Sequence, residues 1–564
     1  MKPSNLVYGL DDRPPTWVTF FLGFQHVTII SIALVFPVLA VRAMGGDTAQ
    51  ATFMVSMSMI AGGLAVVAQA LRRGPMGSGY LCPAVCGPSF LSATVLAAKL
   101  GGLPLVFGMT FFAGLVEAAF SRVLKRLRVL FPAEVTGLIV AMVGITVIKL
   151  AGSNFLAVDE GAEARMADIA VAVFTLAVMV GLNVWSKGKV RLFCILIGMA
   201  LGYGAAAAMG VLRAEHWAVV GNNAWASFPL TDHPGWAFDW SMALPFAIAI
   251  ICSSLKSVGD ITTCQKINDT GWKRPDMDNI SKGILADAFG SVAAGALGGM
   301  GQSTSSSNVG LSIATGATSR VVAMSTGLLL TALAFCPKLA SIFAIMPRPV
   351  VGATLIFALS FMVVAGFNIV MSRMIDARKT FVIGLSVILG LMVDMLPGAF
   401  DGLPQWLHPV FASSLSAATI AAVALNLIFR IGVRSTADLE LAPDENYPER
   451  VFAFFDRQGG AWAARPEVVN RARDAVNEIA EAVLGDGDGS LSARAGFDEY
   501  RLDVHLTWTG RPLDFPEDRP TKGEVLADAE AGRRLSGFLA RQFADQLEVR
   551  RDGEANTVTL HFNH

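Results

Sequence analysis

The sequence has few charged residues. Asp, Glu, Lys and Arg make up only 16% of its 564 residues, compared with about 25% in ordinary soluble proteins. The scarcity is confined to residues 1–434, which have a net charge of +9, whereas residues 435–564 are rich in charged residues and have a net charge of −10. These compositions exclude a secreted enzyme, a nucleic-acid-binding protein built on a basic domain, and a disordered scaffold. They predict a membrane-embedded body followed by a soluble, acidic domain.

Neither the cysteines nor the start of the chain indicates secretion or metal binding. The six cysteines lack the spacings of disulfide frameworks and zinc sites, and all lie in or beside apolar segments, which is typical of small core residues. Asp11, Asp12 and Arg13 precede any apolar run, which is not the pattern of a cleavable signal peptide. We therefore expect residues 1–16 to be a short cytoplasmic N-terminus, and we expect neither a metal nor an organic cofactor.

Apolar runs dominate the chain from Trp17 to Ile431. Eleven runs are long enough to cross a bilayer, and three more, at 79–98, 283–300 and 304–319, are interrupted by Gly, Ser and Pro. Together they predict an all-α polytopic membrane domain with 14 transmembrane segments over residues 17–432. The uninterrupted runs lie near 17–41, 51–71, 103–121, 129–150, 166–185, 191–212, 242–263, 321–345, 347–370, 380–398 and 409–431.

The basic residues support this count. If the N-terminus is inside, the inside loops carry most of the Lys and Arg, beginning with Arg72 and Arg73, and the outside loops carry few. This distribution satisfies the positive-inside rule with both termini cytoplasmic. With only 13 segments, the loops after the missing segment would no longer alternate between inside loops rich in Lys and Arg and outside loops with few of them.

The sequence also contains an internal repeat. The motif P-x-x-V-x-G opens apolar runs at Pro132 and Pro347, and the interrupted segments around Ser89 and Ser307 are separated by nearly the same length of chain. Seven segments separate the members of each pair, and because seven is odd, the two halves have opposite orientations. Two short matches can arise by chance, but their agreement with the charge topology predicts an inverted repeat of residues 17–212 and 242–431.

The interrupted segments 3 and 10 hold equivalent places in the two halves. Unwound backbone cannot face lipid, so we expect the breaks near 82–90 and 300–308 to meet near the bilayer midplane. The half-helices that follow would direct N–H groups and positive dipole ends at a ligand. We therefore predict that Ser89 and Phe90 on one break, and Ser306 and Ser307 on the other, contact a substrate. Such an arrangement is typical of secondary transporters.

Three charged residues lie at membrane depth. Lys256 and Asp260 are four residues apart and share a helix face, and Asp287 lies in the next, interrupted segment. Intramembrane charges are costly and are functional candidates. One interpretation is a structural Lys256–Asp260 salt bridge. In the other, Lys256 faces the substrate, Asp260 balances its charge or takes part in proton coupling, and Asp287 pairs with Lys256 or caps backbone nearby.

Two further sets of polar residues lie in apolar surroundings. Gln25 and His26, in the first span, either hydrogen-bond between helices or support a substrate site. Residues 303–310 read S-T-S-S-S-N-V-G, which as a surface loop would be unremarkable. At membrane depth, however, Asn308 offers two donors and an acceptor, and the serines offer hydroxyls, which suits the edge of a planar heterocycle.

The sequence resembles a known family at several of these positions. Residues 308–316, N-V-G-L-S-I-A-T-G, match N-x-G-x-x-x-x-T-G, which is most of the signature of the nucleobase–ascorbate transporter family (nucleobase:cation symporter 2, including the uracil and xanthine permeases). Gln25-His26, the stretch from Lys256 to Asp260, and Asp287 resemble the motifs of the family's first, eighth and ninth helices. The resemblance covers about residues 15–431.

The resemblance implies a fold and a mechanism. It implies 14 helices in two inverted sevens that form core and gate domains in a bacterial inner membrane, and we expect a homodimer. It also implies cation-coupled uptake, with the proton as the coupling ion and sodium as the alternative. The substrate would lie between the broken helices near Lys256, Ser307 and Asn308. The supporting positions would be Asp260, Asp287, Gln25, His26 and Thr315.

This sequence departs from the family at two of these positions. Lys256 stands where the family has Glu, and Ser307 stands where it has Gln, Glu or Pro. A glutamate accepts hydrogen bonds from ring N–H groups, whereas a lysine only donates and carries positive charge. Lys256 therefore favours an anionic or acceptor-rich substrate, such as urate, xanthinate or another organic anion, over neutral uracil.

The acidic C-terminal region, residues 433–564, has the pattern of an α/β domain. We predict an amphipathic helix over Pro466–Leu484, a strand over Arg501–Trp508, a helix over Arg533–Gln546 and a closing strand over Thr557–Phe562.

This region resembles the histidine-kinase-like ATPase fold of anti-sigma factors. Residues 510–516, G-R-P-L-D-F-P, resemble their Asp-x-Gly-x-Pro-Phe-Asp-Pro turn, and residues 535–539, L-S-G-F-L, resemble their glycine-rich lid. The adenine-binding aspartate would fall at Trp508, and no Asn follows Glu478 as a magnesium ligand. We therefore expect a regulatory or packing domain that does not hydrolyse ATP, with residual nucleotide binding as the alternative.

The sequence therefore predicts a membrane transporter and not an enzyme. The leading hypothesis is proton-coupled uptake of a purine-type nucleobase, with the bilayer and a small-molecule substrate as partners and without nucleic acid. One alternative is a transporter-derived membrane sensor that signals through the C-terminal domain. The other is an organic-anion exchanger or channel.

Overall fold

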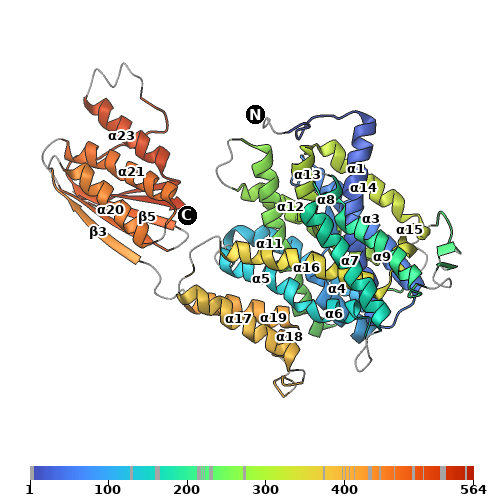
Figure 1. Cartoon of the computed structure of the whole chain (residues 1–564). Coiled ribbons are helices and arrows are strands. Elements are labelled where there is room, and N and C mark those ends of the chain that lie inside the picture. The colour runs from blue at the N-terminus through green and yellow to red at the C-terminus, as the bar shows by residue number, and fades with distance from the viewer. Residues whose placement is uncertain are drawn as a thin grey trace. The chain divides into compact units, whose positions relative to one another are not determined.

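The computed structural model divides into two compact units, Met1–Asn426 and Leu427–His564 (Figure 1). It describes the chain apart from residues 1–5, 128–130, 159–164, 188, 213–216, 219, 222, 228–232, 271–274, 372–374, 376, 397, 401, 405–406, 412, 430–434, 444–445, 463, 486–489, 499–500, 521–528, 553–554 and 564.

The first unit is almost entirely helical. Two short strands, β1 (Ala84–Cys86) and β2 (Gln302–Thr304), are its only strands within the described residues. In chain order the helices are α1 (Thr16–Ile30), η1 (Ser31–Leu34), α2 (Val35–Ala43), α3 (Thr48–Ala70), η2 (Pro88–Phe90), α4 (Leu91–Leu127), α5 (Ala133–Thr146), α6 (Ile148–Phe155), α7 (Met166–Trp185), α8 (Lys189–Leu192), α9 (Cys194–Ala208), α11 (Trp240–Asn268), α12 (Met277–Leu297), α13 (Ser306–Thr315), α14 (Arg320–Ala334), α15 (Pro337–Ala344), α16 (Arg348–Val370), α17 (Ala377–Met395), α18 (His408–Phe411) and α19 (Ser414–Phe429).

The helices follow the predicted apolar runs. Each of the fourteen predicted segments overlaps at least one helix. Among the described residues, eight helices are long and apolar enough to span a membrane, or nine if α14 and α15, which are bent by 83°, form one span. Helices α9 and α19 are apolar but shorter. The structure is thus a polytopic helical membrane fold, and the number of 14 crossings remains a prediction.

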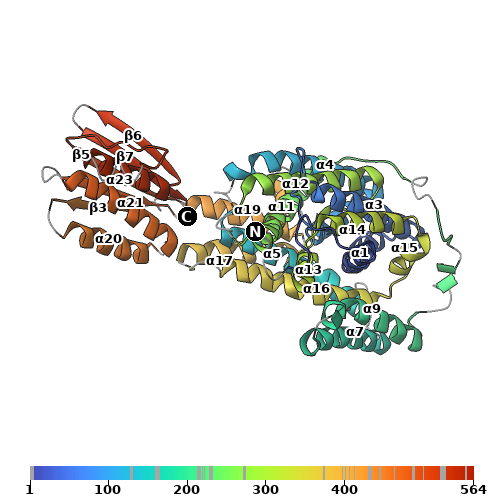
Figure 2. The ribbon, with the colours of Figure 1, turned by 90° about the horizontal axis from the view of Figure 1, so that it is seen from above.

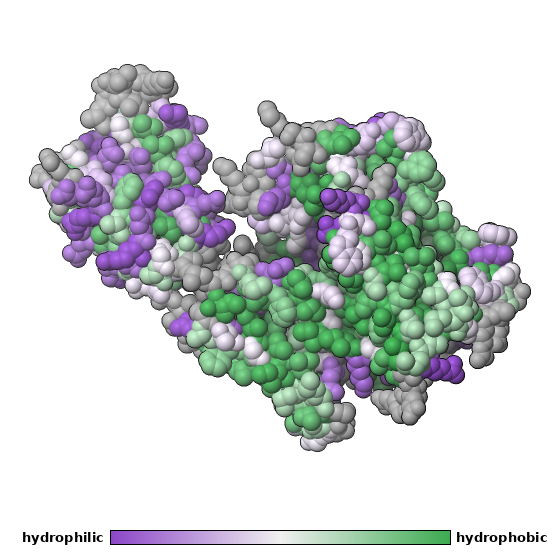
Figure 3. All heavy atoms as spheres, viewed as in Figure 1, coloured by the Kyte–Doolittle hydropathy of each residue, from purple (hydrophilic) through white to green (hydrophobic). Residues whose placement is uncertain are grey.

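The surface of the first unit is apolar over broad areas. Figure 3 shows hydrophobic residues gathered over its helices, whereas hydrophilic residues dominate the surface of the second unit. Large side chains on the lateral helices are strongly exposed, including Phe21 (58%), Leu328 (70%) and Trp185 (81%). Apolar patches of this extent on a folded protein mark a surface that water does not cover, which is consistent with a bilayer around this unit.

Helix α4 contains two predicted segments. Its backbone leaves the helical region at Gly101 and at Gly102, whose φ is +66°, a conformation that is strained for residues with a Cβ. The break falls between the runs 79–98 and 103–121. The two glycines thus divide one continuous stretch into the interrupted third segment and the fourth.

The two predicted breaks meet. Strands β1 and β2 pair in antiparallel register, with Ala84 opposite Thr304 and Cys86 opposite Gln302. Helices η2–α4 and α13 begin directly after the strands, and the Ser305 side chain caps α13 by accepting from the Asn308 backbone N–H. The expectation that the breaks near 82–90 and 300–308 come together is therefore confirmed. Pairing the strands also satisfies backbone groups that lipid could not.

The N-terminal segment ties two loops together on one face. Tyr8 accepts from the Thr318 backbone N–H at 2.8 Å. Asp11 forms ion pairs with Arg72, at 3.4 Å, and with Arg320, which also donates to the Gly79 carbonyl at 2.6 Å. The start of the chain, the loop after α3 and the loop after α13 therefore share a side, as the predicted alternation requires.

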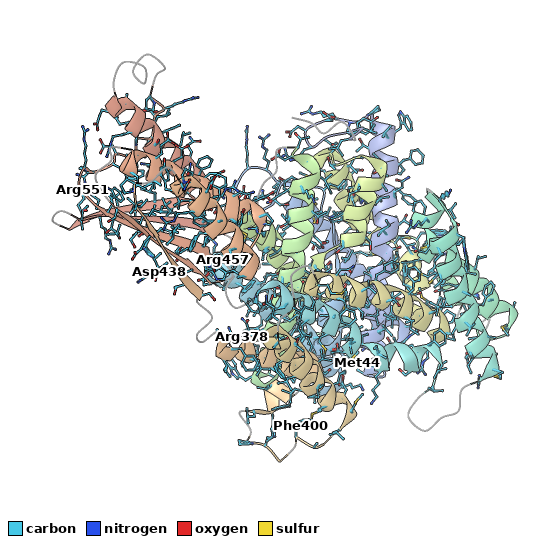
Figure 4. The ribbon with its side chains drawn as sticks, turned by 60° about the vertical axis from the view of Figure 1, so that its left-hand side comes forward. Met44, Arg378, Phe400, Asp438, Arg457 and Arg551 are labelled. Carbon is cyan, nitrogen blue, oxygen red and sulfur yellow. The ribbon has the colours of Figure 1, made fainter. Side chains whose placement is uncertain are left out.

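The second unit is an α/β domain. Its sheet has the antiparallel order β3-β4-β5-β7-β6, and its helices lie on one side of that sheet (Figure 2). Charged side chains such as Asp438, Arg457 and Arg551 project from this unit in Figure 4. The elements are β3 (Ser435–Leu441), α20 (Tyr447–Ala461), α21 (Pro466–Leu484), β4 (Leu491–Phe497), β5 (Arg501–Thr509), α23 (Ala529–Phe543), β6 (Gln546–Asp552) and β7 (Ala555–Asn563).

The predicted elements of this region are all present. Helix α21 has the predicted bounds, and β5, α23 and β7 overlap the predicted strand, helix and closing strand. Alternate residues of β5, from Leu502 to Trp508, are buried against the helices. The hydrophobic core is therefore the unit's own, and the relation of this fold to the histidine-kinase-like ATPases remains a prediction.

Candidate functional site

The charged residues predicted at membrane depth converge where α11 passes the paired strands. Lys256 and Asp260 lie one turn apart on α11, with Nζ and Oδ2 3.5 Å apart. The Lys256 ammonium also donates to the Thr304 carbonyl at 2.5 Å. Their side chains are 17% and 10% exposed. Lys256 therefore has a carboxylate and a carbonyl as neighbours but is not sealed from the surroundings.

Asp260 connects α11 to the second break. Its Oδ2 accepts from the Thr304 hydroxyl at 2.7 Å, and its Oδ1 accepts from the Ser306 hydroxyl at 2.6 Å. Both carboxylate oxygens are thus hydrogen-bonded to the segment that opens α13. Asp260 fixes the start of this half-helix relative to Lys256.

Asp287 is the third charged residue of the site. It lies on α12 with only 1% of its surface exposed, and its Oδ2 lies 2.5 Å from the Ser257 hydroxyl on α11. The Ser257 hydroxyl is in turn 3.0 Å from that of Thr304. Among its described contacts, the hydrogen bond of Asp287 is to Ser257, and neither a direct pairing with Lys256 nor a backbone cap is found.

The sequence analysis missed a further intramembrane carboxylate. Glu117, on α4, is fully buried, and its Oε1 lies 2.7 Å from the Ser254 hydroxyl on α11. Its Oε2 has no hydrogen-bond partner within the described residues. The signal that could have found it is a lone acidic residue within the apolar run 103–121. The sequence analysis also did not assign the hydroxyls of Ser257 and Thr304 to the site, although Thr304 lies in the polar run 303–310, because their contacts with the two aspartates depend on how the segments pack.

Asn308 is placed differently from the expectation. Its Oδ1 lies 2.8 Å from Nδ1 of His26 on α1, and its Nδ2 donates to the Ser305 hydroxyl at 2.9 Å. Both Asn308 and His26 are buried. Both ends of the amide are therefore engaged within the protein, which links α13 to α1. His26 thus contacts Asn308, the neighbouring Gln25 is only partly buried, and a support role for either residue remains a prediction.

The remaining predicted residues fall into three groups. Ser306 and Ser307 are exposed at the start of α13, where neighbouring side chains leave them accessible. Ser89 and Phe90 are buried, and the Phe90 ring packs so closely on Gly87 and Gly301 that a Cβ at either position would lie 2.8 Å from it. Thr315 donates to carbonyls of its own helix and does not join the charged residues.

Two glycines on the helices that carry the site are open to their surroundings. Gly259 on α11 and Gly310 on α13 are exposed, and a Cβ at either position would meet nothing within 4 Å. Helix α11 contacts both α12 and α13, and α11 and α12 lie side by side in Figures 1 and 2. Within the residues that the structure describes, no group of three or more His, Cys, Asp or Glu side chains is arranged to hold a metal ion. The side chains that meet at the site can form hydrogen bonds, balance charge and transfer protons.

These features define a multi-pass membrane transporter with a charged site at two paired, broken segments. The chain belongs to the xanthine/uracil permease family: its residues 18–398 match the family model described as Permease family. This places it among the nucleobase–ascorbate transporters, which are transporters and not enzymes.

Curated relatives cover most of the chain. A Clostridium perfringens protein that its name assigns to the purine permeases is 30% identical over 431 residues, which are 76% of this chain and 93% of that one. The xanthine permeases XanP and XanQ of Escherichia coli are each 28% identical, over 441 and 448 residues, with 76% of this chain and 95% of theirs covered.

The fold is also similar to that of a solved anion transporter. The murine Solute Carrier 26 family member A9, in its inward-facing state, superposes with a TM-score of 0.50 and 10% sequence identity over 77% of this chain and 72% of that one. At this identity the similarity concerns the fold alone.

Proposed function

We propose that this protein is a secondary active transporter that takes up a purine-type nucleobase of the xanthine or urate class together with a proton. The observation that carries the proposal is the charged site of Lys256, Asp260 and Asp287 at the paired breaks. Membership of the permease family and the names of the xanthine permease relatives support the substrate class.

The composition of the site favours an anion over a neutral base. The Lys256 ammonium lies beside Asp260, which is hydrogen-bonded to the exposed Ser306, and it has hydrogens to donate beyond the one given to the Thr304 carbonyl. Helices η2–α4 and α13 both begin here, so their positive dipole ends favour negative charge. An oxopurine anion offers the acceptors that these groups require.

Charge balance supports coupling to a proton. The Lys256 ammonium is already paired with the Asp260 carboxylate at 3.5 Å, and a second carboxylate of the site, Asp287, is buried. An anion bound beside them would add a further negative charge in surroundings of low polarity, where uncompensated charge is costly. Uptake of one proton by a carboxylate offsets that charge. Sodium is the alternative coupling ion.

The proposal also covers the topology of the protein, its membrane, its assembly and the role of its C-terminal unit. The 14 segments form inverted repeats, arranged as core and gate domains in the inner membrane of a bacterium, with both termini cytoplasmic and a homodimer as the assembly. The C-terminal unit is a non-catalytic regulatory or packing domain. The shared face of the N-terminal segment and two loops supports the topology.

Uptake measurements test this function. Labelled xanthine, urate and uracil are offered to bacterial cells that lack their own nucleobase permeases and express the protein, with and without a proton uncoupler. We expect the two purines to accumulate, the uncoupler to abolish accumulation, and Asp260→Asn to be inactive. Asp47→Asn, which alters the exposed cap of α3, serves as the matched control and should transport.

Other outcomes would contradict the proposal. Binding of a purine without accumulation indicates a sensor. Accumulation or current that is independent of the proton gradient indicates an exchanger or channel. Failure of the wild type to accumulate either purine refutes the substrate class.

A further inference from the structure

A continuous chain of side-chain oxygens connects two carboxylates of the site. Asp287 Oδ2 lies 2.5 Å from Ser257 Oγ, which lies 3.0 Å from Thr304 Oγ1, which lies 2.7 Å from Asp260 Oδ2. All four residues are buried, with Ser257 and Thr304 at 0% exposure. The chain crosses from α12 through α11 and β2 back to α11. Every contact has the length of a hydrogen bond.

The number of hydrogens in this chain is informative. Three oxygen–oxygen contacts require three hydrogens, but the hydroxyls of Ser257 and Thr304 supply only two. If both carboxylates are ionised, each hydroxyl donates outward and the central contact has no hydrogen. One additional proton on either carboxylate allows all three contacts to be hydrogen bonds that point in one direction.

We propose that Ser257 and Thr304 form a proton relay between Asp287 and Asp260. A proton leaves Asp287 Oδ2 for Ser257 Oγ, the Ser257 hydrogen moves to Thr304 Oγ1, and the Thr304 hydrogen moves to Asp260 Oδ2. One O–H bond breaks and one forms at each hydroxyl, so both are regenerated, and the net change is one proton moved between carboxylates. Rotation of the two hydroxyls resets the chain.

The position of the proton on the relay determines whether the positive charge of Lys256 is balanced within the protein. The relay ends at Asp260 Oδ2, the oxygen that lies 3.5 Å from Lys256 Nζ. With Asp260 ionised, the ammonium is balanced within the protein. With Asp260 protonated, the ammonium is free to balance an anionic substrate. This inference rests on the proposed function, because it assigns a role to the proton that accompanies the anion.

Other titratable groups surround the relay without joining it. The charged neighbours of Asp287 are Lys256 and Asp260 on α11 and Glu117 on α4. Glu117 is hydrogen-bonded to Ser254, one turn before Ser257 on α11, and is not part of the chain of side-chain oxygens. The thiol of Cys82 lies beside Cys264 and near both aspartates. His26, from α1, is bound to Asn308 instead.

The relay residues and their neighbours in sequence allow closely matched variants for a test. Ser257→Ala and Thr304→Val remove the relay hydroxyls, and Ser257→Thr and Thr304→Ser retain them. Ser253→Ala and Ser303→Ala are the controls, because both hydroxyls are fully buried in the same helix and strand and have no hydrogen-bond partner within the described residues. Each full-length variant is reconstituted in liposomes and tested with labelled xanthine and urate in two assays: accumulation driven by a pH gradient, and exchange between equal pH on both sides.

We expect the relay to be required for coupling and not for exchange, because exchange reuses the proton already on Asp260. Ser257→Ala and Thr304→Val should lose gradient-driven accumulation by about tenfold or more, as for removal of a proton-transfer group, and should retain exchange. The hydroxyl-retaining variants and the two controls should behave as the wild type.

The outcomes separate this inference from the function on which it rests. If the wild type accumulates neither purine, the proposed function itself fails. If the wild type accumulates a purine and the alanine and valine variants do so equally, the relay is refuted and the function stands. Loss of both accumulation and exchange, an equal loss in the Ser253 or Ser303 controls, or a sodium requirement in the wild type likewise refutes the relay.

Discussion

The His26 imidazole and the Asn308 amide form a buried contact between α1 and α13, with Nδ1 and Oδ1 2.8 Å apart. Because Asn308 Nδ2 donates to Ser305, its Oδ1 is the end that faces His26, so His26 Nδ1 carries the hydrogen. A residue expected to contact the substrate thus uses its amide oxygen and one amide hydrogen within the protein, and it links α1 to the half-helix that carries the exposed Ser306 and Ser307.

Replacing Asn308 should therefore impair transport through position and stability. Asn308→Ala leaves the buried His26 N–H without an acceptor, which costs about 1–3 kcal/mol, so we expect a lower melting temperature together with loss of uptake in a protein that still inserts. The measurement is thermal unfolding in detergent beside xanthine uptake. A double-mutant cycle with His26→Ala should show strong coupling. Unchanged stability with lost binding would instead indicate direct substrate contact.

Lys256 should determine both the charge of the substrate and the pH dependence of its binding. Urate is a suitable probe because it is already an anion at neutral pH. If binding takes up a proton, linkage requires wild-type affinity to fall as pH rises. Lys256→Gln removes a charge-assisted hydrogen bond of about 1.5–3 kcal/mol, so affinity should fall about tenfold or more.

Lys256→Glu should lose urate altogether and gain affinity for a neutral base with ring N–H donors, such as uracil. Binding measured across pH for the wild type and both variants decides the point. If Lys256→Gln binds urate with the wild-type affinity and pH profile, Lys256 is a structural partner of Asp260 and the argument for an anionic substrate fails.

Glu117 should tolerate a neutral isostere. The single hydrogen of Ser254 Oγ lies within reach of both Glu117 Oε1 and the Ile250 carbonyl. A protonated Glu117 would donate to Ser254, which would then donate to Ile250. Glu117→Gln can reproduce this pattern with its amide N–H groups, so we expect a change in stability of about 1 kcal/mol or less.

The contrasting variant is Glu117→Ala, which leaves a cavity and should cost about 2 kcal/mol or more. Thermal unfolding and urate binding are measured for both. Loss of binding in Glu117→Gln at unchanged stability would show that Glu117 acts as an ionised counter-charge to the site.

The features that sequence could predict are those with a local pattern. The breaks at β1 and β2 are visible as Gly, Pro and Ser within apolar runs, and the bounds of α21 follow from its apolar stripe. The spacing of Lys256 and Asp260 places them on one helix face without reference to any other segment. In contrast, β3 is an edge strand with mostly exposed residues, so its alternation carries little signal.

The features that sequence could not predict depend on register between segments. Ser257 and Thr304 are unremarkable until α11, α12 and β2 bring them between two aspartates. The contact of Asn308 with His26 joins residues 282 positions apart, and no local pattern specifies it. Asp287 was expected to pair with Lys256 or with backbone, and only the packing of α12 on α11 shows that it meets a serine.

The C-terminal unit should not hydrolyse ATP. Trp508, where the predicted resemblance would put the adenine-binding aspartate, is buried in the core with its indole N–H donating to the Arg511 carbonyl at 3.2 Å. At Gly537, a Cβ would lie 1.9 Å from the Asp514 carbonyl, so α23 lies directly on the 510–516 turn. We expect no magnesium-dependent phosphate release from residues 433–564. Turnover that is lost on removal of magnesium would contradict this.

Glu478 makes the stability of the C-terminal unit depend on pH. Burial raises the pKa of this carboxyl above its ordinary value. The hydrogen bond from Ser536 on α23 opposes the rise in pKa, and the neighbouring carboxylates Glu481 and Asp474 add to it. In the range between the ordinary glutamate pKa and the raised one, the folded unit therefore holds more protons at Glu478 than the unfolded chain does. Stability must then fall as pH rises through that range.

Glu478→Gln removes this proton linkage while keeping a side chain of the same size. We expect the variant to be more stable than the wild type at neutral pH and to have a flatter stability profile above the ordinary glutamate range. Glu440→Gln, at an exposed position on β3, is the control and should follow the wild-type profile. The measurement is denaturant unfolding of residues 433–564, which have their own hydrophobic core, at a series of pH values. A wild type whose stability rises through this range, or a Glu478→Gln variant with an unchanged profile, would show that the α21–α23 contact accommodates the ionised carboxylate without penalty.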